Sequence, residues 1–204
     1  MAKLFVVGLT GPTGAGKSEA ARVFAEQGCA IIDADVLSRR AVEKGSLCLD
    51  ALAHHFSESI LNSDGTLNRK ALAAVAFSSP EQTQLLNRIV HPAVIRMTEE
   101  ALVCAQAQGK AVAVIDAPLL FQAGLDSICD VTVAVLAPPQ VRLQRICVRD
   151  GLTEEQAQTR MRAQPDEAYY ADHATHTVWN TDDRAVLREQ VQSLWEQWRG
   201  RWCE

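Results

Sequence analysis

The chain has 204 residues, of which 48% are hydrophobic and 22% are charged, a balance typical of one globular unit with a sizeable core. Its formal net charge of −5 at pH 7 argues against a broad nucleic-acid-binding surface, and no apolar run is long enough to cross a membrane. We expect small-molecule ligands, with neither a nucleic acid nor a membrane as partner, and a monomer or a weak homo-oligomer.

The cysteines predict the compartment. The six cysteines are scattered, and no two of them form a C-x-x-C pair: Cys29, Cys48, Cys104, Cys129, Cys147 and Cys203. This pattern indicates reduced thiols rather than a disulfide framework or a zinc site. The N-terminus shows no signal-peptide cleavage pattern, so we expect a cytoplasmic protein.

Apolar runs alternate with helical patterns along the chain. A helix is expected over 17–27 and a final amphipathic helix over 183–199. Strands are expected over 4–9, 30–32, 111–115 and 131–136, with a weaker candidate over 177–179. Strands that alternate with helices in this way form a parallel α/β sheet, here of five strands.

Two intervals depart from this alternation. Residues 36–109 contain several helical segments and no convincing strand, which predicts a helical insertion. Residues 139–173 are helical and rich in arginine. The expected core therefore consists of residues 1–35, 110–138 and 174–204.

The segment GPTGAGKS, residues 11–18, matches G-x-x-x-x-G-K-[ST] between a predicted strand and a predicted helix. Its glycines let several backbone N–H groups point at one anion, and the following helix adds its positive end. Lys17 can reach the β- and γ-phosphates, and the Ser18 hydroxyl can bind Mg²⁺. We predict a nucleoside triphosphate site that includes Gly11, Thr13, Gly14, Ala15, Gly16, Lys17, Ser18 and Glu19.

Three acids follow predicted strands, where ligands bind in open α/β sheets. Asp33 could accept a proton from an attacking hydroxyl, or it could cap the next helix, although Asp35 suits the cap better. Asp116 could hold Mg²⁺ directly or through a water molecule, or it could be an ordinary turn acid.

Three arginines in the second helical interval share helix faces in pairs, namely Arg142, Arg145 and Arg149. A run of charges of this kind is typical of a solvated helix face. Beside a triphosphate site, the same arginines could belong to a lid that neutralises the transferring charge.

Taken together, the motifs resemble the dephospho-CoA kinase family over nearly the full chain. The resemblance rests on GLTGPTGAGKS, IDADVLSR, GTLNRKAL, LLNRIVHP, DAPLLFQAGLD, QRICVRDGLTEEQAQTRMRAQ and TVWN. It implies a P-loop three-layer α/β fold, and transfer of the γ-phosphate of ATP to the ribose 3′-hydroxyl of dephospho-CoA, with Mg²⁺. Residues 36–109 would bind the CoA substrate, and residues 139–173 would form the lid.

The resemblance also implies roles for single residues. Asp33 would be the general base, and Lys17 and Arg145 would act on the phosphates. Asn180 would lie near the adenine. Arg39, His91 and Leu119 match positions that would meet dephospho-CoA together with Asp33, although His91 could equally be a helix-start or core histidine.

Some positions depart from the family pattern. Glu19 stands where threonine is common, Arg142 replaces a common glutamine, and Ser57 stands where glycine is expected. Glu19 lies in the first turn of a helix, where the helix dipole tolerates an acid, but it adds negative charge near the phosphates.

Three other functions compete with this interpretation. A kinase acting on a nucleotide or nucleoside would keep the P-loop but should not combine the HP and PLLF motifs. A GTPase would need an N-K-x-D motif, which the sequence lacks. A binding protein without turnover is opposed by the presence of Lys17, Ser18, Asp33 and Arg145.

Overall fold

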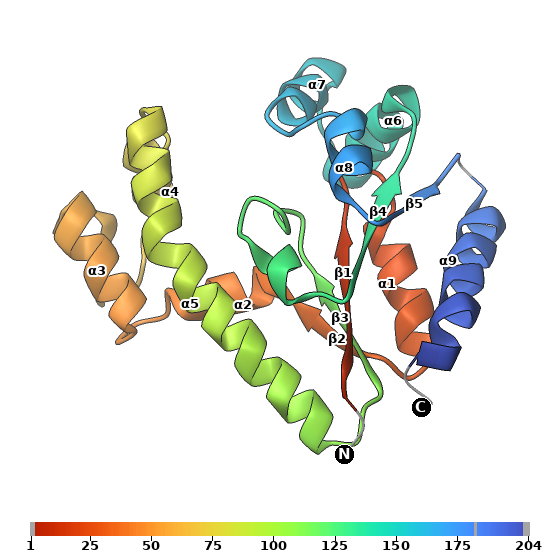
Figure 1. Cartoon of the computed structure of the whole chain (residues 1–204). Helices are drawn as coiled ribbons and strands as arrows, with labels where there is room; N and C mark the ends of the chain where they lie inside the picture. Colours follow the sequence, from red (N-terminus) through yellow and green to blue (C-terminus); the bar gives the residue numbers. More distant parts are fainter. Residues whose placement is uncertain (1–2, 182, 202–204) are drawn as a thin grey trace. The chain divides into compact units, whose positions relative to one another are not determined.

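The computed structural model describes residues 3–181 and 183–201 (Figure 1). Its contacts divide the chain into two compact units, Met1–Ile32 with Leu102–Glu204, and Asp33–Ala101. These divisions lie three and eight residues before the predicted boundaries, which fall after residues 35 and 109. The second boundary moves because one helix, α5 (Pro80–Ala107), begins in the second unit and ends in the first.

A parallel sheet organises the first unit. Within the described residues its strands are β1 (Phe5–Thr10), β2 (Ala30–Asp33), β3 (Val112–Asp116), β4 (Val131–Leu136) and β5 (His176–Trp179), in the order β2-β3-β1-β4-β5. Strand β1 pairs in parallel with β3 and β4, and β4 pairs in parallel with β5. The prediction of a five-stranded parallel α/β fold is confirmed, including the weak candidate strand near 177–179.

Helices cover both faces of this sheet. Side chains alternate along a strand, so Val131, Val133 and Val135 of β4 join the core beneath α1 (Lys17–Glu26) and α9 (Arg184–Trp198). The intervening Ala134 and Leu136 pack against α8 (Glu167–His173) on the other face. Because β1 and β4 are buried on both faces, their sequences are continuous apolar runs.

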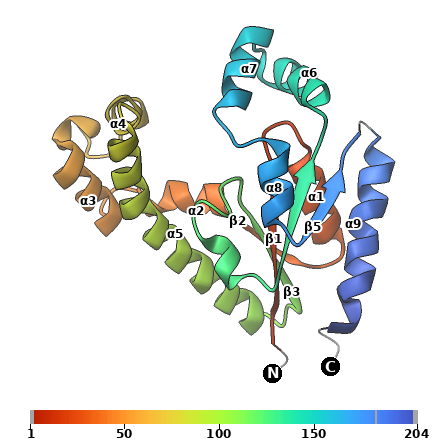
Figure 2. The same ribbon diagram turned by 45° about the horizontal axis from the view of Figure 1, so that its top comes forward.

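Helices α1 and α9 lie side by side, as both ribbon views show (Figures 1 and 2). Trp198 near the end of α9 is 1% exposed and stacks on Phe24 of α1, with ring centroids 6.3 Å apart. Helix α9 begins after Asp183, whose side chain accepts a hydrogen bond from the backbone N–H of Ala185. This packing places the start of α9 beside the first turns of α1.

Helices α6 and α7 follow β4 in the first unit. Helix α6 (Pro139–Asp150) ends at Gly151, which has a positive φ of 65°, and α7 (Glu154–Arg162) begins with a Thr153–Gln156 capping box. Leu143, Ile146 and Ala157 form a small core between α6 and α7. The short 3-10 helices of this unit are η2 (Leu125–Ile128) and η3 (Arg199–Arg201).

The second unit has its own core. Its elements are α2 (Ala34–Ala41), α3 (Leu47–Phe56), η1 (Glu58–Ile60), α4 (Arg69–Ala76) and most of α5. Leu52, Ile60 and Ala76 are fully buried together in it. Its proposed role in binding CoA stays a prediction.

Among the described residues, no helix is both long enough and apolar enough to cross a bilayer. The cysteines at 29, 48, 104, 129 and 147 are free thiols, and Cys203 lies outside the described residues. Burial raises the pKa of Cys29 and of Cys129 to about 12, so both thiols stay protonated at neutral pH.

Candidate active site

The loop between β1 and α1 has the backbone that the P-loop motif requires. Gly11, Gly14 and Gly16 have φ values of 144°, 79° and 102°, which side chains rarely tolerate. A Cβ on Gly11 would collide with the carbonyl oxygen of Val135, and one on Gly14 would lie 2.9 Å from the carbonyl oxygen of Arg142. Glycine is therefore needed here both for its backbone conformation and for close approach to neighbouring chain.

Lys17, the first residue of α1, forms an ion pair with Asp116, the last residue of β3. The two side chains are 17% and 14% exposed. Strand β3 pairs with β1, and in this pairing Asp116 lies opposite Leu9 of β1. The fold thus joins two predicted site residues that are 99 positions apart in the sequence.

Arg145 of α6 and Asn180 after β5 meet on the P-loop. Arg145 donates one hydrogen bond to the carbonyl oxygen of Gly14 at 3.2 Å and another to Asn180 Oδ1 at 3.0 Å. Asn180 Nδ2 donates to the carbonyl oxygen of Ala15 at 2.8 Å, and Asn180 is only 6% exposed. The predicted lid arginine and the predicted adenine-side asparagine are therefore one hydrogen-bonded group with the loop.

Arg142 is a further contact to the P-loop, although it is not among the predicted site residues. It is 3% exposed, its Nε donates to the carbonyl oxygen of Thr13 at 2.9 Å, and it forms an ion pair with Glu167. The backbone N–H of Thr13 donates to Gln164 Oε1 at 2.8 Å. Two signals pointed to Arg142, namely its place in the predicted lid and its spacing of three residues from Arg145 on one helix face.

The solvated-face interpretation of the arginine run is wrong for Arg142, which is buried. It fits Arg149, which is exposed and pairs with Asp150 at 2.7 Å. Arginines on one helix thus differ in solvent exposure, because α6 turns one side toward the P-loop and the other side away from it.

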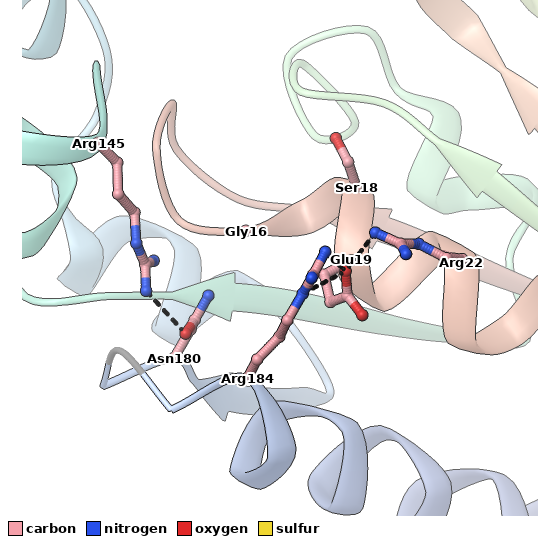
Figure 3. Close-up of a pocket in the computed structure, with 7 residues that line it drawn as sticks. All are labelled: Gly16, Ser18, Glu19, Arg22, Arg145, Asn180 and Arg184. Atoms are coloured by element: carbon pink, nitrogen blue, oxygen red, sulfur yellow. Dashed lines mark hydrogen bonds and ion pairs between the residues drawn. The ribbon is translucent and has the colours of Figure 1, made fainter. Parts of the chain in front are cut away.

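An open cavity of about 350 Å³ lies beside the P-loop (Figure 3). Its lining residues are Gly16, Ser18, Glu19, Arg22, Arg145, Asn180 and Arg184. Five of these are predicted site residues. Arg22 and Arg184 were missed, because an arginine on an amphipathic helix is usually a solvated residue and nothing in the local pattern distinguishes these two.

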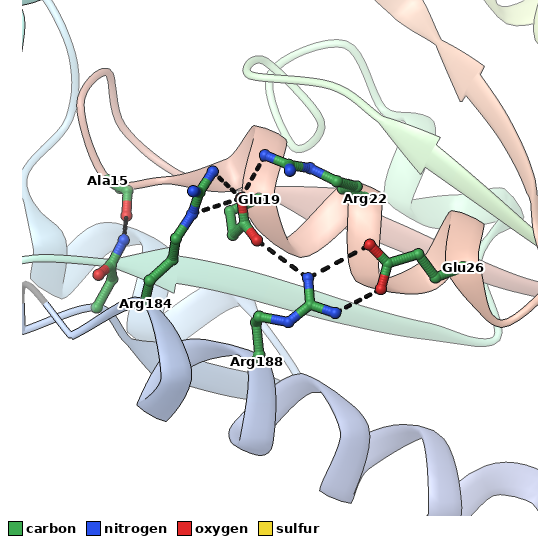
Figure 4. Close-up of polar contacts among 7 residues, drawn as sticks. Ala15, Glu19, Arg22, Glu26, Arg184 and Arg188 are labelled. Carbon is green, nitrogen blue, oxygen red and sulfur yellow. Dashed lines mark hydrogen bonds and ion pairs between the residues drawn. The ribbon is translucent and has the colours of Figure 1, made fainter.

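Glu19 does not stand as an isolated acid near the phosphates. Its carboxylate accepts hydrogen bonds from Arg22, Arg184 and Arg188 (Figure 4). Burial alone would raise the pKa of Glu19, but the hydrogen bonds from Arg188 and Arg184 and the charges of Arg184 and Arg22 outweigh it and hold the pKa below its ordinary value.

Three of the predicted substrate residues belong to the second unit. Asp33 is exposed and its Oδ1 accepts a hydrogen bond from the backbone N–H of Val36 at 3.0 Å, so Asp33 caps α2. The assignment of the cap to Asp35 is wrong, because β2 continues to Asp33 and the helix begins one residue later. Arg39 lies exposed in the last turn of α2.

His91 lies in the middle of α5, next to Pro92, so it is not at a helix start. It is half-buried, and burial lowers the pKa of its imidazole. Leu119, in the first unit, is 48% exposed in the segment after β3 and does not line the cavity.

A parallel sheet with a glycine loop, a lysine and an acid at its carboxyl edge defines a P-loop protein of the nucleoside triphosphate-binding class. Comparison with known proteins narrows this class. The family model described as dephospho-CoA kinase matches residues 5–185. The chain belongs to the dephospho-CoA kinase family, and it is a phosphotransferase.

Individual relatives agree with this assignment. The chain is 45% identical to the dephospho-CoA kinase of Corynebacterium efficiens, over 92% of this chain and 94% of that protein. It is 38% identical to the dephospho-CoA kinase of Corynebacterium diphtheriae, over 94% and 96% of the two chains. The crystal structure of TT1252 from Thermus thermophilus superposes with a TM-score of 0.81 at 31% identity, covering 95% of this chain and 97% of that one.

Proposed function

We propose that this chain transfers the γ-phosphate of ATP to the ribose 3′-hydroxyl of dephospho-CoA, giving CoA and ADP, the last step of coenzyme A biosynthesis. The observation that carries this proposal is the family match over residues 5–185, which includes the P-loop and the segments that line the cavity. The reaction requires positioning and charge neutralisation more than covalent catalysis, and the site offers both.

The nucleotide would bind along the P-loop. Backbone N–H groups of Gly11–Ser18 would hold the phosphates, together with the positive end of α1. Lys17 would leave Asp116 for the β- and γ-phosphates, and Arg145 would neutralise charge on the transferring group. The cavity beside Gly16 and Asn180 is a suitable place for the rest of the nucleotide.

The oxygen-bearing residues here suit Mg²⁺. Ser18 lines the cavity, and the Asp116 carboxylate lies beside Lys17 at the edge of the sheet. Hydroxyl and carboxylate oxygens are the ligands that Mg²⁺ prefers. Ser18 and Asp116 would hold the ion, Asp116 directly or through water, and the ion would supply charge neutralisation on the phosphates.

The acceptor would be activated by Asp33. Its position at the carboxyl end of β2, with one oxygen engaged by the Val36 N–H, leaves the carboxylate exposed for a proton from the 3′-hydroxyl. Arg39, His91 and Leu119 would bind dephospho-CoA, residues 36–109 would form its domain, and residues 139–173 would be the lid over ATP. A lid would exclude water as a competing acceptor.

The test is ADP release from purified protein with ATP and Mg²⁺, with and without dephospho-CoA. Adenosine and AMP serve as control acceptors. ADP formation that depends on dephospho-CoA, with CoA as the product, supports the proposal. Turnover with AMP or adenosine alone would instead indicate the nucleotide or nucleoside kinase, and ATP binding without any turnover would indicate a binding protein.

The proposals for the cellular compartment and for the oligomeric state rest on the sequence alone. The scattered cysteines support the cytoplasm. A monomer or a weak homo-oligomer is proposed, and sedimentation at several concentrations tests it.

A further inference from the structure

Two arginines of α9 and two glutamates of α1 form a row of ion pairs between these helices (Figure 4). Arg184 and Arg188 are one turn apart on α9, and Glu19 and Glu26 are two turns apart on α1. Arg184 pairs with Glu19, whereas Arg188 pairs with both glutamates. The row therefore has a Glu19 end and a Glu26 end.

Glu19 is the centre of this row. Its side chain is 9% exposed, whereas that of Glu26 is 44% exposed. Glu19 Oε2 accepts from Arg22 at 2.6 Å and from Arg184 Nε and Nη2 at 3.0 and 2.7 Å, and Oε1 accepts from Arg188 at 3.1 Å. One carboxylate thus fixes three guanidinium groups that would otherwise repel one another.

Only the Glu19 end faces the cavity. Glu19, Arg22 and Arg184 line it together with Ser18, and Arg188 and Glu26 are not among its lining residues (Figure 3). Arg184 meets Glu19 through its Nε and Nη2 edge, so its Nη1 is not part of that pair. The guanidinium groups of Arg22 and Arg184 are thereby held at the cavity wall, although their side chains are 54% and 67% exposed.

We propose that Glu19 is a positioning residue for ATP, which acts by holding Arg22 and Arg184 at the nucleotide cavity. This inference rests on the proposed placement of ATP in that cavity. Ordering a long, exposed side chain on binding costs free energy, and a carboxylate that orders it beforehand removes this cost. The acid that departs from the family pattern therefore assists the binding of a polyanion by arranging the cations that face it.

The test compares Glu19→Gln with Glu26→Gln. Both variants remove one carboxylate from the same row and one partner of Arg188, but only the first releases Arg22 and Arg184. For Glu19→Gln we expect the KM for ATP to rise about fivefold, with kcat changed less than about twofold, because two arginines must then be ordered on binding. The KM for dephospho-CoA stays unchanged, and Glu26→Gln keeps the wild-type KM for ATP. Calorimetric titration with ATP should likewise give a higher Kd for Glu19→Gln than for the wild type, and an unchanged Kd for Glu26→Gln.

Two results would overturn the inference. An unchanged KM for ATP in Glu19→Gln, with a lower Tm, would make the row a purely structural link between α1 and α9. A lower KM would make Glu19 a competitor of the phosphates for the arginines. If wild-type protein shows no turnover dependent on dephospho-CoA, the proposed function fails, and the calorimetric comparison still tests Glu19.

A second variant keeps the inference testable even if Glu19→Gln folds poorly. Arg184 is largely exposed, so Arg184→Gln should fold normally. It should raise the KM for ATP as well, and the double variant should raise it less than the product of the two single effects, because Glu19 acts through Arg184. Independent, multiplying effects would contradict the proposed route.

Discussion

The Lys17 ammonium group is paired with the Asp116 carboxylate across the carboxyl edge of the sheet. Both side chains are largely buried, and they come from the first residue of α1 and the last residue of β3. A lysine is a compact point charge on a flexible stem, so it can exchange this partner for a phosphate without any change in the backbone. The pair holds the lysine side chain beside Asp116 at this edge of the sheet.

Lys17→Ala is expected to abolish turnover. The variant loses the charge proposed for the β- and γ-phosphates, so kcat should fall at least about a hundredfold. Steady-state ADP release measures this effect. Lys3→Ala is the matched control, since Lys3 pairs with Asp130 at the protein surface and should leave kcat unchanged. Comparable kcat values for Lys17→Ala and the wild type would remove Lys17 from the mechanism.

Asp33→Asn separates the two roles of Asp33. Asparagine caps a helix as well as aspartate does, so α2 and the Tm should be preserved, while an amide cannot accept the proton of the acceptor hydroxyl. We expect kcat to fall about a hundredfold, with smaller changes in KM. Asp35→Asn, two residues further on, should behave as the wild type. Unchanged kcat in Asp33→Asn would reduce Asp33 to a helix cap.

Arg145→Ala should impair phosphoryl transfer more than ATP binding. The guanidinium group that contacts Gly14 and Asn180 is proposed to neutralise charge in the transition state, so kcat should fall about tenfold or more. Arg149→Ala, on the exposed side of the same helix, serves as the comparison and should keep wild-type kinetics. If the two variants show equal kcat values, Arg145 has only a structural role.

Ser57→Gly is expected to stabilise the protein. Ser57 has φ 79° and ψ 152°, a conformation almost restricted to glycine that costs a serine on the order of 1–3 kcal/mol. Its hydroxyl accepts a hydrogen bond from the Ser59 N–H at 3.2 Å, so the net gain should be about 1 kcal/mol. Urea unfolding measures it. Ser57→Ala, which loses the hydroxyl but keeps the Cβ, should be destabilised, and a destabilised Ser57→Gly would contradict this account.

The stability that Glu19 contributes should depend on pH. Its pKa in the folded protein lies below the ordinary value of 4.5, so its contribution is fully present above pH 4.5 and is lost as the pH falls through the folded-state pKa. The Tm of wild-type protein should exceed that of Glu19→Gln at neutral pH, and the gap should close in acid below pH 4.5. Thermal unfolding of both proteins across this range checks it. A gap that does not vary with pH would exclude the ionised carboxylate as its source.

Local patterns were sufficient for the P-loop and the sheet. Gly11–Ser18 could be interpreted from the sequence because the positive φ values of its glycines, the lysine and the following helix are local requirements. The strands could be predicted because burial on both faces leaves an apolar run. The helix cap was assigned to Asp35 rather than Asp33 because the end of a strand depends on its pairing, which local patterns do not show.

The sequence by itself determined the family, through short motifs with fixed spacing, and the parallel α/β fold, through its apolar runs. The residues assigned to the nucleotide chemistry stay a prediction. Only the tertiary structure decided what surrounds those motifs. It buried Arg142 against Thr13, joined Arg145 to Asn180, and surrounded Glu19 with three arginines. The reason is physical. Whether a charged side chain is solvated or paired depends on the elements packed beside it. Helices α1 and α9 are far apart in the sequence, and only the folded sheet brings them together.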